Sequence, residues 1–146
     1  MSNSAFERYA PFIQEYIYRK SWTDLREVQV EACDAIMDTN KHVIVASGTA
    51  SGKTEAFFPI LTILEKNPST SVGVMYIGPL KALINDQFER LNELLDDREV
   101  PVWPWHGDIS QSTKRKALQV AQGILQITPE SLEALLMRHP GDACRL

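Results

Sequence analysis

The stretch Ser-Gly-Thr-Ala-Ser-Gly-Lys-Thr at residues 47–54 constrains the fold of this chain more than any other feature. An apolar run at residues 43–46 precedes it, and residues 55–65 can form a helix. Small residues let consecutive backbone N–H groups turn toward an anion, and the first turn of the helix adds a positive dipole. The sequence therefore predicts a strand, a phosphate-binding loop (P-loop) and a helix in this order.

The expected roles differ from residue to residue within this loop. The ammonium of Lys53 would bind the β- and γ-phosphates, and the Thr54 hydroxyl would be a ligand of Mg²⁺. The common pattern has glycine where this chain has Ser47, so the match depends on residues 52–54 and their surroundings. The alternative is a turn that only joins a strand to a helix. The candidate nucleotide-binding residues of the loop are Ser47, Gly48, Thr49, Ala50, Ser51, Gly52, Lys53 and Thr54.

The composition indicates an ordinary globular protein. A chain of 146 residues suits one domain, and its 44% hydrophobic and 23% charged residues are typical of a folded core with a charged surface. We find neither a run long enough to span a membrane nor a signal peptide, so we expect a cytoplasmic protein without a membrane partner. The net charge of −4 argues against nucleic-acid binding through a broad basic surface but leaves a narrow track open.

Two candidate ligand-binding residues precede the loop. Residues 6–20 and 25–37 have apolar side chains at three- and four-residue spacing, which predicts two amphipathic helices. Arg26 and Gln29 lie near the start of the second helix. The Gln29 amide offers both a donor and an acceptor, as recognition of an adenine edge requires. The alternative is that both side chains are merely solvated.

Apolar runs predict four strands, at residues 43–46, 72–77, 100–105 and 123–127. The first two runs are unbroken, which is typical of strands buried on both faces, whereas Pro101 and Pro104 indicate an edge position or an irregular end for the third. Further helices are predicted at residues 80–95, 110–121 and 129–137. This alternation predicts an α/β fold with an open, mainly parallel sheet and helices on both faces.

Polar loops follow each of the predicted strands. In parallel sheets, ligands bind beyond the carboxyl ends of the strands, and these ends lie at one edge of the sheet. The loops that would meet there are residues 47–54, 78–81, 106–108 and 128–130. The pattern therefore predicts one functional edge formed by four loops.

These loops, in this order, resemble motifs of the first RecA-like motor lobe of superfamily 2 helicases, the group that includes DEAD/DEAH-box enzymes. Residues 25–29 are similar to an adenine-sensing element, and residues 47–54 to motif I. Residues 79–83 resemble motif Ia, and residues 128–132 resemble motif Ib. Residues 106–108 lie where such lobes often carry another strand-contacting loop. Within the group, residues 48–54 and 127–136 are most similar to those of large helicases of the Lhr-like and related DNA-repair type.

The resemblance implies functions for individual residues. Arg26 and Gln29 would contact adenine, ATP and Mg²⁺ would be the cofactors, and a second RecA-like lobe would be a partner. Nucleic acid would be a further partner, with DNA favoured over RNA. The residues implied in holding its backbone are Pro79, Leu80, Lys81, Ala82, His106, Gly107, Thr128, Pro129, Glu130 and Ser131. Taken alone, the loops that contain these residues could also be ordinary helix caps.

The resemblance also predicts the domain organisation and limits the expected activity. Residues 1–24 would be a helical flank, and residues 25–146 an incomplete RecA-like ATP-binding domain that ends before the acidic motif II. Phosphoryl transfer depends on the carboxylates of that motif and on the second lobe. We therefore expect an ATP-binding, nucleic-acid-contacting N-terminal fragment of an ATP-dependent helicase, with little ATPase activity in the isolated chain. The alternatives are a non-catalytic nucleotide-binding or interaction module and, less in keeping with the loops, a small kinase.

A strand at residues 43–46 without the motif II strand beside it would be an unprotected sheet edge. Exposed apolar edges invite pairing with another chain. We therefore expect either marginal stability or self-association through this edge.

Overall fold

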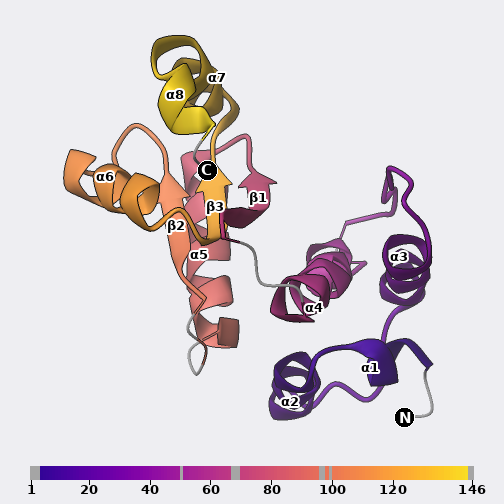
Figure 1. The fold of residues 1–146 in the computed structure, drawn as a ribbon. Helices are drawn as coiled ribbons and strands as arrows, with labels where there is room; N and C mark the ends of the chain where they lie inside the picture. The colour runs from indigo at the N-terminus through magenta and orange to yellow at the C-terminus, as the bar shows by residue number, and fades with distance from the viewer. Residues whose placement is uncertain (1–3, 50, 67–69, 96–97, 99, 145–146) are drawn as a thin grey trace. The chain divides into compact units, whose positions relative to one another are not determined.

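The computed structural model describes residues 4–49, 51–66, 70–95, 98 and 100–144. These residues form two compact units, Met1–Asn67 (unit 1) and Pro68–Leu146 (unit 2). Unit 1 contains helices from α1 to α4 and unit 2 contains the sheet (Figure 1). The expected boundary between residues 24 and 25 stays a prediction.

Unit 1 is helical throughout its described secondary structure. Its elements are α1 (Ser4–Arg8), α2 (Pro11–Arg19), α3 (Glu27–Asp38), the 3₁₀ helix η1 (Lys53–Phe57) and α4 (Phe58–Lys66). The single helix expected at residues 6–20 is therefore wrong, because it is interrupted before Pro11. Proline disfavours helical geometry in the residue before it, and Ala10 is extended there, with φ −57° and ψ 147°.

Aromatic side chains form the centre of unit 1. Phe58, the first residue of α4, has its ring centroid 6.0 Å from that of Tyr9 and 6.1 Å from that of Tyr16. Trp22 stacks on the same ring at 6.3 Å. Edge-to-face and stacked pairs at these distances are favourable beyond the burial of their area. The N-terminal aromatic residues thus anchor the flank to the helix that follows the P-loop.

The strand expected at residues 43–46 is wrong. The structure has no strand there, and the Ile44 side chain is 92% exposed. A strand needs a neighbour for its backbone N–H and C=O groups, and none of the described strands pairs with this segment. The apolar run predicts where a strand could be buried, but not which strand would pair with it. The sheet edge expected at residues 43–46 is therefore wrong too.

Unit 2 contains a three-stranded parallel sheet in the order β1-β3-β2. Its strands are β1 (Val72–Ile77), β2 (Val102–Trp105) and β3 (Gly123–Ile127). Its helices are α5 (Lys81–Leu95), α6 (Gln111–Val120), α7 (Pro129–Arg138) and the short α8 (Pro140–Ala143). The predicted open parallel α/β fold is confirmed. The edge position expected from the prolines is confirmed as well, since β2, which contains Pro104, is an outer strand.

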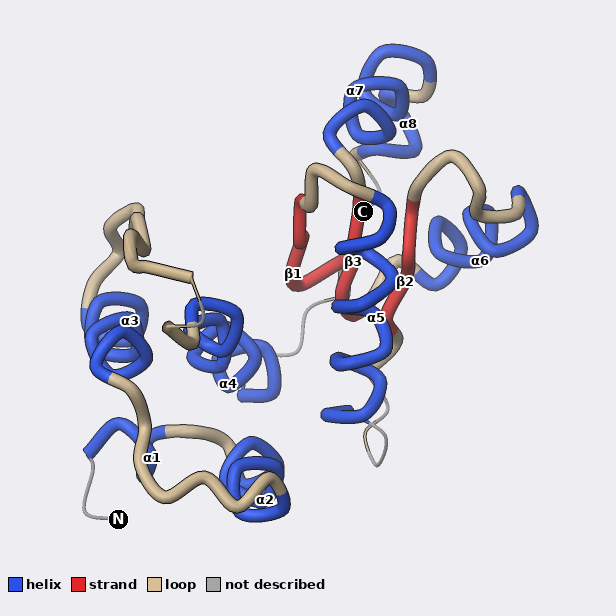
Figure 2. Tube along the Cα trace, turned by 180° about the vertical axis from the view of Figure 1, so that it is seen from behind, coloured by secondary structure: helices blue, strands red, loops and turns tan. Residues whose placement is uncertain are grey.

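Helices pack on both faces of this sheet. On one face, Trp103 and Trp105 of β2 join Leu125 and Ile127 of β3 in a core cluster with Ala117 of α6 and Leu135 of α7. The helix α5 lies on the other face, behind the strands in Figure 1 and in front of them in Figure 2. Alternating side chains along each strand supply the two faces.

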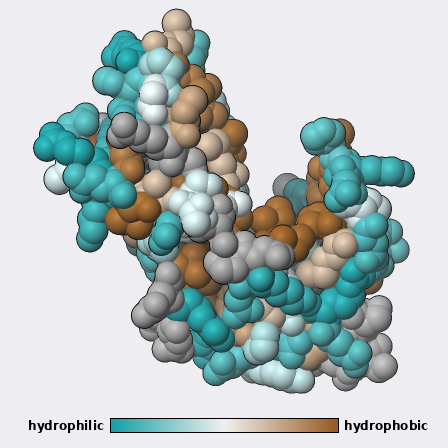
Figure 3. All heavy atoms as spheres, in the orientation of Figure 1, coloured by the Kyte–Doolittle hydropathy of each residue, from teal (hydrophilic) through white to brown (hydrophobic). Residues whose placement is uncertain are grey.

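The outer strand β1 is only half-buried, whereas its apolar run predicts burial on both faces. Met75 is 43% exposed and Ile77 is 51% exposed. Hydrophobic side chains at the surface near β1 and α7 appear brown in Figure 3. The side chains of Met75 and Ile77 on β1 therefore remain in contact with solvent. None of the helices in the described part of the chain is long and apolar enough to cross a membrane.

We predict that Leu125→Ala destabilises unit 2 by about 2–5 kcal/mol, because the fully buried side chain leaves a cavity in the middle strand. Urea unfolding followed by tryptophan fluorescence measures this change, since Trp103 and Trp105 lie in the same cluster. Leu136→Ala, at a side chain that is 54% exposed, is the control and should change the free energy of unfolding by less than about 0.5 kcal/mol. Equal losses in both variants would contradict the assigned core.

Candidate nucleotide and nucleic-acid site residues

The P-loop lies in unit 1 and encloses the ammonium of Lys53. Lys53 Nζ donates to the carbonyl oxygen of Gly48 at 2.5 Å and also to that of Ser47. The hydroxyls of Ser47 and Ser51 are hydrogen-bonded to each other. Ser47, Gly48, Thr49, Lys53 and Thr54 are exposed, and Ala50 lies outside the described residues. If a phosphate bound to Lys53, its oxygens would replace these two carbonyl oxygens as acceptors for the ammonium.

Gly52 is the position in the loop that requires glycine. Its φ is +91°, in the left-handed region that residues with a Cβ rarely adopt. A Cβ there would lie 2.6 Å from Gln29 Nε2 and 2.9 Å from Arg26 Cδ. The loop thus approaches both candidate adenine-binding residues closely, and this approach leaves no room for a side chain at position 52.

Gln29 connects α3 to the loop. Its Nε2 donates to the Gly52 carbonyl oxygen at 3.3 Å, and its Oε1 accepts from the Arg26 backbone N–H at 3.0 Å. The residue is only 3% exposed, so the alternative of a merely solvated side chain is wrong for Gln29. A glutamine amide has two N–H donors and two acceptor lone pairs, and these two contacts use one of each.

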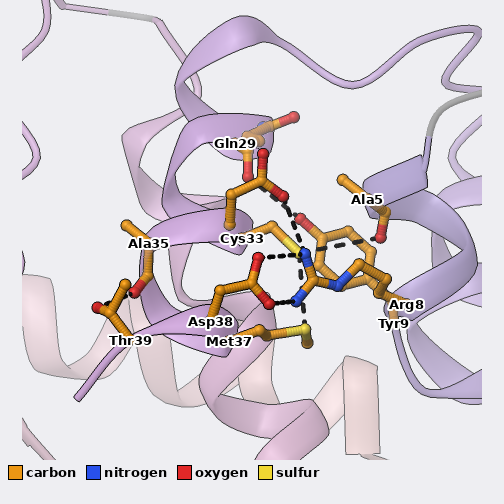
Figure 4. A network of polar contacts seen from close by, with 10 residues as sticks. Ala5, Arg8, Tyr9, Gln29, Cys33, Ala35, Met37, Asp38 and Thr39 are labelled. Carbon is orange, nitrogen blue, oxygen red and sulfur yellow. Dashed lines mark hydrogen bonds and ion pairs between the residues drawn. The ribbon is translucent and has the colours of Figure 1, made fainter.

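A polar network fixes α1 against the helix that carries Gln29 (Figure 4). Arg8 of α1 donates to Asp34 at 3.0 Å and to both carboxylate oxygens of Asp38, at 2.5 and 3.0 Å. The hydrogen bonds from Arg8 lower the pKa of Asp38. The Tyr9 hydroxyl donates to the Gln29 carbonyl oxygen at 3.4 Å. Sequence reasoning missed this network: Asp34 and Asp38 stand four residues apart on one side of α3, but the predicted helix ended at residue 37.

The other candidate loops lie in unit 2, where backbone hydrogen bonds align the ends of the three strands. Gly78 N–H, just after β1, donates to the Ile127 carbonyl oxygen at 3.1 Å. Thr128 N–H, just after β3, donates to the Trp105 carbonyl oxygen at 3.2 Å. The loops that follow β1, β2 and β3 therefore start side by side, as the sequence predicts for three of its four loops.

Lys81 and the loop of residues 106–108 are in direct contact. Lys81 Nζ lies 2.8 and 2.9 Å from the two carboxylate oxygens of Asp108. A Cβ at Gly107 would lie 3.5 Å from the same ammonium. Pro79, Leu80 and Ala82 are exposed around this contact. The sequence identified both loops but not the ion pair that joins them.

The buried side chain of His106 fixes the loop of residues 106–108. It is 3% exposed, and its Nδ1 accepts from the Asp108 backbone N–H at 3.3 Å. The ring proton is then on Nε2, which donates to Asn85 Oδ1 at 3.1 Å. Burial lowers the pKa of His106, so the ring is neutral at pH 7. The buried His106 side chain therefore supports the loop.

The loop after β3 begins with a buried residue, which two exposed residues follow. Thr128 precedes α7 with extended geometry, but it is 1% exposed and its hydroxyl donates to Ser131 Oγ at 3.0 Å. Pro129 and Glu130, in the first turn of α7, are exposed. Within the described residues, no three His, Cys, Asp or Glu side chains are grouped to hold a metal ion.

The sequence profile of the DEAD/DEAH box helicases matches residues 26–145, so the chain belongs to this family. It is 34% identical to the ATP-dependent helicase Lhr-Core of Methanothermobacter thermautotrophicus, over 87% of this chain and 16% of that relative. It is 28% identical to the uncharacterized ATP-dependent helicase YprA of Bacillus subtilis, over 66% of this chain and 13% of that relative. The chain thus spans less than a fifth of the length of both relatives.

Solved helicase structures share this fold. The DUF1998 helicase MrfA bound to DNA and AMPPNP superposes with a TM-score of 0.84 at 24% identity, covering 96% of this chain and 20% of that one. The Mycobacterium smegmatis helicase Lhr bound to ssDNA and AMP-PNP gives 0.75 at 25% identity, covering 90% and 18%. The predicted N-terminal part of a superfamily 2 motor lobe, of Lhr-like type, is confirmed.

We predict that the stability of unit 2 falls as the pH drops below about 6.5, because of His106. The unfolded chain binds a proton at the ordinary histidine pKa, whereas the folded chain resists protonation down to a lower pH. In that interval the unfolded state binds more protons, so stability rises with pH. Thermal melts from pH 5 to 8 measure this slope.

The His106→Gln variant should lose this part of the pH dependence, and it should also melt at a lower temperature at pH 7. His42→Gln, at an exposed side chain in unit 1, is the matched control and should retain the slope. An unchanged slope in His106→Gln would show that the ring is not buried in its neutral form.

Proposed function

We propose that this chain is the ATP-binding, nucleic-acid-contacting N-terminal part of an ATP-dependent helicase. The observation that carries the proposal is the hydrogen bond between Gln29 Nε2 and the Gly52 carbonyl oxygen. It joins the candidate adenine reader to the P-loop within one compact unit. A nucleotide that spans these two elements would contact its base at one end and its phosphates at the other.

ATP with Mg²⁺ is the nucleotide we propose for this unit. Arg26 and Gln29 would bind adenine, and the backbone N–H groups of residues 47–52 would bind phosphate oxygens. Lys53 would neutralise the β- and γ-phosphates, and Thr54 would ligate Mg²⁺. Two features support these roles: the loop is exposed, and Lys53 already lies at its centre.

Nucleic acid is the partner we propose for unit 2, through the loops of residues 79–82, 106–107 and 128–131. Aligned strand ends, the exposed loop residues Pro79, Leu80, Pro129 and Glu130, and Lys81 support this role, since the phosphates of a nucleic-acid backbone are held by amides, hydroxyls and cations. DNA is favoured over RNA because the MrfA and Lhr structures hold DNA. The RNA helicase DExH12 of Arabidopsis thaliana, 40% identical, matches a shorter part, 42% of this chain.

ATP hydrolysis and translocation along nucleic acid would belong to the whole helicase, in which a second RecA-like lobe would be the partner of this chain. We propose that this helicase works in the cytoplasm. Phosphoryl transfer needs carboxylates that hold Mg²⁺ and position water beside the phosphates. We therefore propose that the 146 residues alone bind ATP without turning it over at helicase rates. Residues 1–24 would serve as a flank of the ATP-binding domain at residues 25–146.

We predict that calorimetric titration of the chain with MgADP gives saturable binding that Lys53→Ala weakens at least about tenfold, because a phosphate loses its cation. Lys66→Ala, at an exposed lysine at the end of α4, is the control and should bind like the parent chain. Gln29→Ala should reduce the preference for ADP over GDP. Phosphate release with single-stranded DNA should stay near background in every variant.

Three outcomes would oppose the proposal. Absence of MgADP binding would remove the nucleotide role, and equal binding by Lys53→Ala would remove the assigned P-loop chemistry. Helicase-like turnover that disappears in Lys53→Ala would contradict the expected inactivity of the isolated chain. Nucleotide binding without any nucleic-acid binding would favour the alternative of a non-catalytic module.

We also propose that the chain self-associates through the outer strand β1. Within the described sheet β1 pairs only with β3, and the exposed Met75 and Ile77 add apolar surface beside its free edge. Light scattering should show a mass that rises with concentration. Met75→Lys should shift this rise to higher concentration, because charges at an edge strand oppose pairing. A constant monomer mass at high concentration would contradict this prediction.

A further inference from the structure

The loop that follows β2 carries an acidic side chain that is paired with a lysine of α5, and a second lysine lies over the ring of the residue just before the loop. Asp108 accepts hydrogen bonds from Lys81, the first residue of α5, through both carboxylate oxygens at 2.8 and 2.9 Å. Both side chains are solvent-accessible, with 48% of Lys81 and 70% of Asp108 exposed. Exposed ion pairs contribute little to stability, so the fold does not depend on this one.

The second lysine is Lys114, in the first turns of α6. Its ammonium lies 6.0 Å from the centroid of the Trp105 ring, and Trp105 is the residue just before the loop of residues 106–108. The hydrogen bonds from Lys81 lower the pKa of Asp108, and Lys114 adds to this effect. The charges of both lysines therefore act on the same carboxylate.

The position of Asp108 is set by the fold as well as by its ion pair. His106, buried and neutral, accepts from the Asp108 backbone N–H and donates to Asn85 on α5. The backbone that carries the carboxylate is thereby fixed to the helix that begins with Lys81. Gly107, between them, has no side chain to cover the ammonium.

We propose that Asp108 is a built-in competitor of nucleic-acid phosphates for Lys81, and that Lys114 is a second phosphate-binding residue at this loop. The inference rests on the proposed function and deepens it, because it assigns two residues and a regulation to the nucleic-acid site of unit 2. A backbone phosphate would take the carboxylate's place on the Lys81 ammonium, and Lys114 would bind a phosphate beside it. The carboxylate thus keeps the affinity of this loop low.

The test measures binding of fluorescein-labelled oligothymidylate to the full 146-residue chain by anisotropy, at several salt concentrations. Asp108→Asn removes the charge but keeps the size of the side chain, and it should tighten binding about threefold or more. Asp24→Asn changes the net charge equally at an exposed site of unit 1 and should have little effect. Lys114→Ala should weaken binding and reduce the slope of log K against log salt by about 0.7, whereas Lys41→Ala should not.

The outcomes separate this inference from the proposed function. If the parent chain binds DNA, but Asp108→Asn behaves like Asp24→Asn and Lys114→Ala like Lys41→Ala, the inference is overturned and nucleic-acid binding stands. If only Asp108→Asn binds, the competitor role is supported. If neither binds, both are overturned.

A measurement on the unmutated chain covers the case in which Asp108→Asn fails to fold, as circular dichroism would reveal. Titration of oligothymidylate into the ¹⁵N-labelled chain should shift the backbone amide signals of Lys81, Asp108 and Lys114. Shifts confined to the loop of residues 128–131 would overturn the inference while supporting nucleic-acid binding elsewhere in unit 2.

Discussion

The arrangement of the loops in unit 2 depends on the pairing of β3 with a parallel strand on each side. Because all three strands point the same way, their carboxyl ends meet, and the hydrogen bonds from Gly78 to Ile127 and from Thr128 to Trp105 continue the pairing into the loops. The Lys81–Asp108 contact follows from this alignment, since α5 starts after β1 and Asp108 follows β2. Side chains 27 positions apart therefore meet at the sheet edge.

Strand pairing also explains which parts of the fold the sequence predicts. The ranges expected for β1 and β3 coincide with the structure, because each run is apolar and has a neighbour to pair with. Residues 43–46 have the same apolar signal but no partner among the described strands, and Ile44 is exposed. The hydrophobic pattern of a segment indicates how well it could be buried. A strand also needs a neighbouring strand for its backbone hydrogen bonds, and the sequence of one segment does not show whether such a neighbour exists.

In the candidate site, the sequence predicts which residue types are present but not the contacts that they make. The chemistry of Lys53, Thr54 and Gln29 is readable from local sequence, because a spacing of few residues defines the loop and the helix start. The contacts that fix them are not, since Arg8 reaches Asp34 and Asp38 across at least 26 residues, and Gln29 reaches Gly52 across 23. His106 was expected at the nucleic-acid surface, but its burial makes it a support for Asp108.

The departure from the P-loop pattern at Ser47 has a physical explanation in the loop itself. Among the described glycines of the chain, only Gly52 and Gly123 have positive φ, and Ser47 adopts no such conformation. A side chain at position 47 therefore costs no backbone strain, and its carbonyl oxygen remains available to Lys53. At Gly52 both reasons for glycine apply, because φ is +91° and Gln29 and Arg26 lie against the backbone. The requirement for glycine is thus concentrated at the position that contacts α3, and the opposite end of the loop is free to carry serine.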